Sequence, residues 1–510
     1  MKDDNKNSFK YYLKKSYKTI IIVAVFLLLT YWARLISDSF SIDTELYIQE
    51  YTHSFDWWLN LERWGLVLLN KILKIGPLII PHANFLTVLF IFVYSILYCY
   101  LFYLSIGNKY KEKYLKYQFI FPIIFITSPI FAEQYNFINQ NASVSLAICF
   151  VATSLILLFK SDNESNIKNK YILIISSLIL STIAFGTYQS IIPLYILSVV
   201  ACYILKCISD EDSSWKYLIK RIIIFGINAV LYLLISKILS DGNTYLNSGW
   251  QDSGLICFRN IYYVIVSVLK CETVFYNVSY LIAIAMIIIV NVYLFFKKKN
   301  NAGIIISSIG LLLSPFFIMM ITGVDQLKRT QFNYSFAIGF IFLVFAIVLN
   351  NKKTRKILSI FIIVLSLGVA YNQSIITSKL FYSDNVRYQN DVLYANKIQS
   401  MIEQKEWYDS NKKYKLIFVG KNEAKAVNNY LKGEVIGKSF FEFDYEYDYG
   451  VTQRAKALFA TLGYYYDKPT TKEFDWAKKY VLDNDIEPMP SSDSIINIDD
   501  KIIIRLSKEL

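Results

Sequence analysis

The chain has 510 residues, 55% of them hydrophobic and only 18% charged, with a formal net charge of +13, six cysteines and two histidines. Soluble domains carry about 25% charged residues, so this composition argues against an ordinary soluble enzyme, and its high apolar and aromatic content excludes a disordered chain. Two histidines exclude a histidine-rich metal centre, and the cysteines show no metal-binding or redox spacing. We therefore predict a membrane protein that carries a soluble module and needs no metal or cofactor.

Apolar segments of membrane-spanning character recur along the chain. A spanning helix needs about 20 apolar residues, and such segments predict a mainly α, polytopic helical bundle with eleven spans over residues 1–375. The segments are 18–36, 84–106, 118–132, 142–159, 171–186, 190–206, 218–237, 279–296, 302–322, 333–350 and 357–375. The first is too long for a typical signal-peptide core, which predicts an uncleaved anchor.

Basic residues are distributed unevenly between the loops. With the N-terminus inside, the inside segments hold 24 Lys and Arg residues and the outside loops hold eight. Because cytoplasmic loops are enriched in Lys and Arg, we predict that the N-terminus is inside and the C-terminus outside. The positive charge then sets the orientation in membrane lipid, and nucleic acid is not an expected partner. The stretches 64–81 and 255–270 are apolar but carry cations, so we expect interfacial helices there.

Residues 376–510, which we call the C-terminal module, differ in character from the rest. They hold 20 basic and 21 acidic residues and predict a small extracytoplasmic α/β domain. Lys415–Gly420 is typical of a buried strand, and alternation around Asp499–Asp500 predicts a β-hairpin. We expect helices over 422–432, 451–463 and 471–482. No nucleotide-binding fingerprint is present.

The first outside loop, about 37–83, is long and unusually polar. Its carboxylates are Asp38, Asp43, Glu45, Glu50, Asp56 and Glu62, with aromatic residues such as Trp57 among them. A carboxylate can take a proton from a sugar hydroxyl, and an aromatic ring can stack on the apolar face of a sugar. The pattern is therefore typical of sugar chemistry, although a solvated amphipathic loop has the same composition.

Several short motifs follow one another in order along the chain. They are SIDTELYI (41–48), WWLNLERWGLVLLNKIL (57–73), SPIFAEQYNF (128–137), GTYQS (186–190) and the final MPSSDSIINIDDKIIIRLS. Together they resemble the bacterial GtrII-type glucosyltransferase family. The resemblance implies a GT-C-type fold in the bacterial cytoplasmic membrane. It also implies transfer of a hexose, glucose in this family, from a polyprenyl-phosphate donor to a glycan on the extracytoplasmic face.

The resemblance also indicates which acidic residue acts as the base. GT-C enzymes carry an acidic residue shortly after the first span, a position that Asp43 occupies here; Glu45 is the alternative and Asp38 follows. The base would deprotonate the acceptor hydroxyl, which attacks the anomeric carbon in line. A single displacement of this kind inverts the anomeric carbon, and the polyprenyl phosphate leaves as a stabilised anion.

Cations outside the membrane are candidates for binding the donor phosphate. Lys328 and Arg329 lie in a short outside loop between spans, where charge close to hydrocarbon indicates function. Arg can bind a phosphate through two hydrogen bonds, whereas Lys acts as a point charge. Interfacial snorkelling is the alternative for both. Arg63 matches the family's Arg-aromatic-Gly pattern and binds either phosphate or a nearby carboxylate.

Five residues are candidates for contacts with the sugar or the acceptor: Trp57, Glu133, Gln134, Tyr188 and Gln189. Helix capping is the alternative for Glu133 and Gln134, and simple interfacial placement is the alternative for Tyr188. Cys257 and Cys271 lie on the same predicted side, either as a disulfide or as two free thiols.

Two other functions remain open. A lipid-linked sugar flippase or transporter would also be polytopic and basic, but internal repeats and charges at the centre of a span are more usual there. A glycan polymerase or ligase would also use outside arginines, usually from a large loop between spans.

Overall fold

The computed structural model describes residues 7–76, 78–209, 215–240, 250, 254–297, 302–324, 326–349, 355–424, 430–443 and 449–509. Within these ranges, ten helical segments are long and apolar enough to cross a membrane. They are α2 (Tyr17–Leu35), α6 (Ile80–Ser105), α10 (Ile138–Asp162), α11 (Ile167–Thr187), α12 (Ile191–Ile208), α13 (Trp215–Leu239), α15 (Ser279–Phe296), α16–α17 (Ala302–Thr322), α18 (Phe332–Leu349) and α19 (Arg355–Glu403). The predicted fold class, a polytopic helical bundle with a small α/β module, is confirmed.

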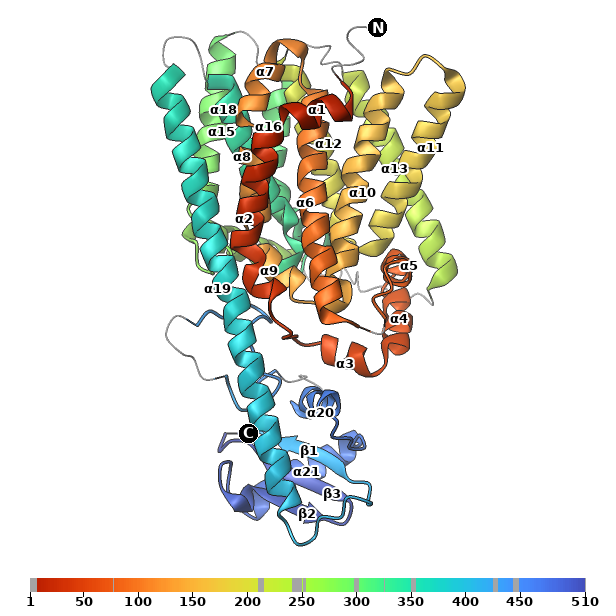
Figure 1. Cartoon of the computed structure of the whole chain (residues 1–510), viewed down its shortest axis with the longest axis vertical. Helices are drawn as coiled ribbons and strands as arrows, with labels where there is room; N and C mark the ends of the chain where they lie inside the picture. The colour runs from red at the N-terminus through yellow and green to blue at the C-terminus, as the bar shows by residue number, and fades with distance from the viewer. Residues whose placement is uncertain are drawn as a thin grey trace.

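The helices run alongside one another as a bundle, with the N-terminus at one end and the C-terminal module beyond the other (Figure 1). We call the second end the module end. Among the ten candidate spans of the described residues, α18 is the most enclosed, with 94% of its apolar window buried. It packs against α7 (Asn108–Tyr117), α8 (Ile120–Ile126), α12 and α15. The short α1 (Phe9–Lys15) lies at the N-terminal end.

The prediction of one continuous span over 118–132 is wrong. The segment forms α8 and α9 (Ile130–Tyr135), separated at Thr127–Pro129. Proline lacks an amide N–H and its ring crowds the preceding turn, so a helix cannot continue through Pro129 undisturbed. The break stays fully buried because the Thr377 hydroxyl on α19 donates to the Thr127 carbonyl at 2.8 Å.

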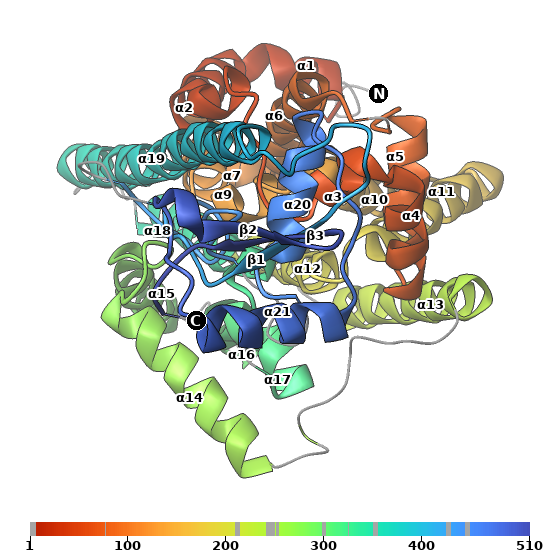
Figure 2. The ribbon, with the colours of Figure 1, turned by 90° about the horizontal axis from the view of Figure 1, so that it is seen from below.

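The first loop (37–83) is largely helical. It contains α3 (Thr44–Gln49), α4 (Tyr51–Asn60) and α5 (Trp64–Ile72). α5 packs against α10 and α11 at the module end. The second amphipathic stretch forms α14 (Gly254–Lys270), which lies at the periphery across the direction of the bundle (Figure 2).

α19 leads directly into the C-terminal module. It is 49 residues long and crosses residue 375 without a break, so the predicted domain boundary falls inside one helix. The module has a three-stranded sheet in the order β1-β3-β2, formed by β1 (Lys415–Val419), β2 (Ile495–Ile498) and β3 (Lys501–Arg505). β2 and β3 form the expected antiparallel hairpin, and β1 pairs in parallel with β3.

Two of the three predicted helices of the module are present, as α20 (Thr452–Thr461) and α21 (Thr471–Asp483). The third prediction, a helix over 422–432, is wrong for the described residues 422–424 and 430–432, which have no helical structure; residues 425–429 lie outside the described ranges. The Leu431 amide instead donates to the hydroxyl of Ser383 on α19, at 2.9 Å.

The core of the module is continuous with the module end of the bundle. Phe40 and Ile42 of the first loop and Phe137 of the bundle belong to the same buried apolar cluster as Phe418 and Leu458 of the module. Since apolar burial is the main source of stability, the module and the first loop stabilise each other.

Two of the sequence motifs meet where α5 packs on α11. A Cβ atom added at Gly65 would lie 2.7 Å from the carbonyl carbon of Gly186 and from the amide nitrogen of Thr187. The Trp64 ring covers Gly186 from the other side. The glycines of ERWG and GTYQS therefore allow the two helix backbones to approach each other.

Replacing Gly65 by Ala should destabilise the protein, because the added methyl group has no space and overpacking costs about 1–3 kcal/mol. Thermal unfolding of the purified protein in detergent measures the effect. Gly226→Ala is the matched control, since its Cβ would meet nothing within 4 Å and helix propensity favours Ala. Equal melting temperatures for the two variants would contradict the packing role of Gly65.

Candidate active site

Two carboxylates of the first loop share one arginine of the C-terminal module. Arg454 on α20 donates from Nη1 to Glu45 Oε1 at 2.7 Å and from Nη2 to Asp43 Oδ1 at 2.8 Å. A further bond joins the same two helices, from Gln49 Nε2 to the Ala457 carbonyl at 2.8 Å. The two residues predicted as base and alternative base therefore lie in one ion-pair cluster, together with an arginine that the sequence did not indicate.

The two carboxylates differ in their surroundings. The Asp43 side chain is 47% exposed, whereas the Glu45 side chain is fully buried. Burial raises the pKa of the Glu45 carboxyl to about 7; Arg454 opposes this rise and Asp43 adds to it. Asp43 precedes α3 with a backbone φ of 68°, a left-handed conformation that Asp and Asn tolerate better than most residues. The pair thus offers one accessible acid and one buried acid that titrates near neutral pH.

Two of the predicted phosphate-binding cations lie near this pair. The Arg63 guanidinium is 4.9 Å from the Tyr188 ring centroid, and Nε donates to Gln189 Oε1 at 3.3 Å. Burial lowers the pKa of Arg63; the positive charge of Arg329 lowers it further, and Asp43 opposes this. Arg329 itself lies 4.5 Å from the ring centroid of Phe137. Arg329 and Asp43 are therefore both electrostatic neighbours of Arg63.

Lys328 and Glu133 tie the module to the bundle. The Lys328 amide donates to Glu434 Oε2 at 2.7 Å, and the Glu434 amide donates to Glu133 Oε1 at 2.5 Å. Glu133 is fully buried, and a Cβ at Gly433 would collide with its carboxylate. Burial and the nearby Glu434 raise the pKa of Glu133 to about 7. Glu133 thus has a supporting role that its sequence position did not reveal.

The remaining predicted sugar contacts have different surroundings. Tyr188 is buried, and Gln189 Nε2 donates to the Leu61 carbonyl at 2.7 Å, so both join the first loop to the turn after α11. Trp57 on α4 is 55% exposed and lies on the surface. Gln134 is fully buried on α9, and neither its side-chain oxygen nor its nitrogen has a partner among the described residues.

Gln134 is one of several buried polar side chains near α3, α9 and the start of α10. Side-chain atoms without a hydrogen-bond partner in the described part of the chain also occur at Thr44, Glu45, Asn136, Asn139 and Gln140. α3 contacts α10, and the intervening Ile42, Phe137 and Ile138 pack in one cluster. An unsatisfied buried polar atom costs about 1–3 kcal/mol. Such a concentration of them therefore favours a site for a ligand rich in hydroxyl groups.

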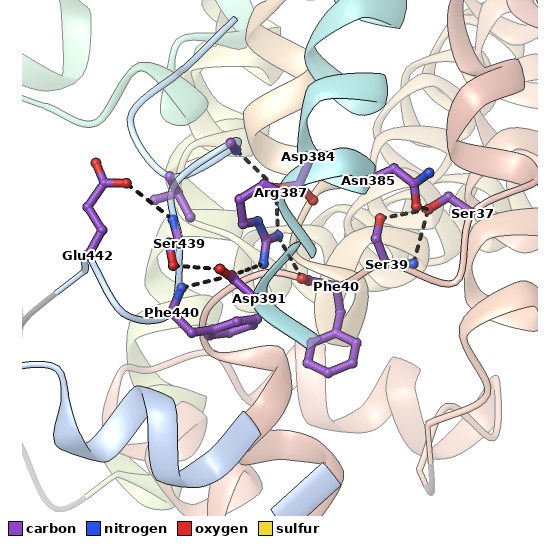
Figure 3. Close-up of polar contacts among 12 residues, drawn as sticks. Ser37, Ser39, Phe40, Asp384, Asn385, Arg387, Asp391, Ser439, Phe440 and Glu442 are labelled. Carbon is purple, nitrogen blue, oxygen red and sulfur yellow. Dashed lines mark hydrogen bonds and ion pairs between the residues drawn. The ribbon is translucent and has the colours of Figure 1, made fainter. Parts of the chain in front are cut away.

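A second ion-pair cluster holds the base of the first loop (Figure 3). Arg387 on α19 binds Asp384 Oδ1 at 2.7 Å and Asp391 Oδ2 at 3.3 Å, and donates to the Phe40 carbonyl at 2.8 Å. The two aspartates in turn accept from Gly437, Ser439 and Phe440 of the module. This cluster was not predicted from the sequence, although the i, i+3, i+7 spacing of Asp384, Arg387 and Asp391 on one helix face could have indicated it.

No group of three or more His, Cys, Asp or Glu residues within the described ranges is arranged to hold a metal ion. Cys257 and Cys271 are free thiols, the second of the two alternatives left open by the sequence.

The fold and the site together define a polytopic membrane protein with a carboxylate–arginine site at one end of its helical bundle. The family model for glucosyl transferase GtrII matches residues 32–344, more than half of the chain. The chain therefore belongs to the GtrII glucosyltransferase family, as the motifs indicated, and is a glycosyltransferase. No curated protein matches it, and no solved structure does. The matched range includes Asp43, Glu45 and Arg329 but ends before Arg387 and Arg454.

Replacing Arg454 by Gln should shift the pH dependence of glycosyl transfer. Arg454 lowers the pKa of the Glu45 carboxyl, so its loss should move the acidic limb of kcat/KM to higher pH, by about one pH unit or more. The pH–rate profile of the purified variant measures this shift. Lys478→Gln removes an exposed cation of α21 and serves as the control. An acidic limb at the same pH in parent and Arg454→Gln would show that the pair does not control the reaction.

Proposed function

We propose that the protein transfers a hexose, glucose by family membership, from a polyprenyl-phosphate donor to an extracytoplasmic glycan acceptor by a single inverting displacement. The observation that carries the proposal is the arginine-bound pair of Asp43 and Glu45 beside buried polar side chains without partners. A glycosyltransferase needs both parts: a base for the acceptor hydroxyl, and polar groups that bind sugar hydroxyls.

In this proposal Asp43 is the base and Glu45 is the alternative. Asp43 is half-exposed and can be reached by an acceptor, whereas Glu45 is buried beneath it. Arg454 fixes the position of both carboxylates and reduces the repulsion between them. The attack then proceeds in line, because the acceptor hydroxyl is held against a base of fixed geometry.

The donor phosphate binds between Arg63 and Arg329. Arg329 and Asp43 are both charged neighbours of Arg63, and two positive charges in a partly buried site stabilise the negative charge that develops on the leaving phosphate. Lys328 adds positive charge to the same loop. The polar side chains of Gln134 and Asn136 bind the sugar, and the exposed Trp57 stacks on the acceptor. Glu133, Tyr188 and Gln189 support these contacts, because each already has partners within the protein.

The location follows from the distribution of charge. The site and the module lie at the end of the bundle away from the lysine-rich N-terminus (Figure 1). By the positive-inside rule that end is extracytoplasmic, in a bacterial cytoplasmic membrane. A transporter is disfavoured because the Asp43–Glu45–Arg454 cluster lies at this end and not midway along the spans.

Asp43→Asn should reduce kcat at least about 100-fold, the loss expected when a general base is removed, while donor binding stays close to that of the parent. Arg329→Ala should weaken donor binding instead. Both are measured by incubating the purified protein with radiolabelled polyprenyl-phosphate glucose and candidate glycan acceptors.

Asp56→Asn is the matched control for charge, since Asp56 is an exposed carboxylate of the same loop. Full transfer by Asp43→Asn would exclude Asp43 as the base, and the same experiment with Glu45→Gln then tests the alternative. Unchanged donor binding by Arg329→Ala would exclude the phosphate role of Arg329.

A further inference from the structure

Arg34 is a buried cation at the module end of α2 that the proposed reaction does not use. The side chain is 3% exposed. Its Nη1 donates to the carbonyl and the hydroxyl of Ser39, at 3.1 and 3.4 Å. Its Nε and Nη2 are buried and have no hydrogen-bond partner among the residues that the structure describes.

The two unpartnered nitrogens form one edge of the guanidinium. Nε and Nη2 carry parallel N–H bonds, the arrangement that binds two oxygens of a phosphate or a carboxylate at once. A buried arginine edge without an acceptor is strongly unfavourable, because the desolvated N–H groups lose their bonds to water. The geometry therefore points to an anionic ligand with two oxygens on one face.

The nearest charged groups do not occupy this edge. Asp384 and Arg387 are the electrostatic neighbours of Arg34. Asp384 Oδ1 is bound to Arg387 and to the Gly437 amide, and Asp384 Oδ2 is buried without a hydrogen-bond partner among the described residues. Within the described residues, no ion pair joins Arg34 to Asp384. Together with Asp391 these side chains have a formal net charge of zero. An anion would therefore be attracted by the unpartnered donor edge of Arg34 and not by an excess of positive charge.

Small polar side chains surround the approach to Arg34. Ser37 donates to Ser39 at 2.7 Å and to Asn385 of α19 at 2.8 Å (Figure 3). Outside this polar group, α2 and α19 expose large apolar side chains, with Ile36 65% and Tyr382 63% exposed. A phosphate with a long hydrocarbon chain matches both features, with its head group at the unpartnered edge of Arg34 and its chain along the exposed apolar side chains of α2 and α19.

The charged neighbours of Arg34 differ from those of Arg63 at the proposed donor site. The charged groups that act on Arg63 are Arg329 and Asp43, whereas those that act on Arg34 are Asp384 and Arg387. We propose that Arg34 binds the phosphate of a second polyprenyl lipid, the one that carries the acceptor glycan. The identification of that lipid as the acceptor rests on the proposed function; the phosphate site itself does not.

Native mass spectrometry of the full chain with decaprenyl monophosphate tests the proposal by counting bound lipids. We expect two per chain for the parent and for Arg259→Gln, an exposed cation on α14, but one for Arg34→Gln. One lipid on the parent, or two on Arg34→Gln, would overturn the second site. If Arg34→Gln binds two lipids and Arg329→Ala binds one, the donor site is supported and the role of Arg34 is overturned. If Arg34→Gln binds one lipid and Arg329→Ala binds two, the role of Arg34 is supported and the donor role of Arg329 is excluded.

Two competitors identify the ligand. Phosphatidylglycerol and inorganic phosphate each supply the same phosphate chemistry without the polyprenyl chain. We expect neither to displace the lipid that depends on Arg34 at equal concentration. Displacement by either one would overturn the assignment to a polyprenyl lipid.

A second variant separates binding from folding. Arg34→Lys keeps the charge and a donor to the Ser39 carbonyl but lacks the paired edge, so we expect phosphate binding about tenfold weaker or more. Ser39→Ala removes a partner of Nη1 and leaves the edge intact, so its lipid count should stay at two. Wild-type binding by Arg34→Lys would show that charge alone is sufficient and would overturn the role of the edge.

Discussion

The arrangement of the site depends on the contact between Arg454 and the carboxylates of Asp43 and Glu45. It joins α20 of the C-terminal module to α3 of the first loop across 409 residues of sequence. An isolated charge in such a buried place is strongly unfavourable, and removing one partner of a buried pair costs about 3–5 kcal/mol. The loop, the module and the end of the bundle therefore hold one another in place. Arg387 forms a second buried ion-pair cluster at the base of the loop, where it binds two aspartates and the Phe40 carbonyl.

Much of the fold could be predicted from hydropathy. Ten of the predicted spans appear as helices of sufficient length, because membrane lipid leaves the backbone no partner other than itself and long apolar runs must become helices. Prediction failed at the break before Pro129 and over 422–432, and at both places another part of the chain supplies hydrogen bonds. At Thr127 the bond comes from Thr377, and at Leu431 it comes from Ser383. A single sequence does not show which distant hydroxyl lies beside a backbone group.

The site was predictable in part, and for a related reason. Arg63 and Arg329 stood out because basic residues outside the membrane are few, whereas the family resemblance indicated Asp43 and Glu45. The structure joins the two carboxylates through Arg454, and Arg63 has Arg329 and Asp43 among its charged neighbours. Arg454 had no such signal: it lies in a polar helix where basic residues are common. Arg34 was not singled out from the sequence, because it lies inside a predicted span. It is the basic residue that belongs neither to the inside and outside loops nor to the C-terminal module. Both arginines are notable because they are buried in the folded chain, and a single sequence does not show which arginines become buried.

The long sequence separation within the Arg454 cluster has a consequence for biosynthesis. At about 5–20 residues per second, α20 leaves the ribosome roughly 20–80 s after the first loop. During that interval Glu45 has no arginine beside it, and its carboxyl can remain neutral by keeping a proton. The membrane-spanning part is therefore made before its charged site can close. The site can therefore assemble only after α20 has been made.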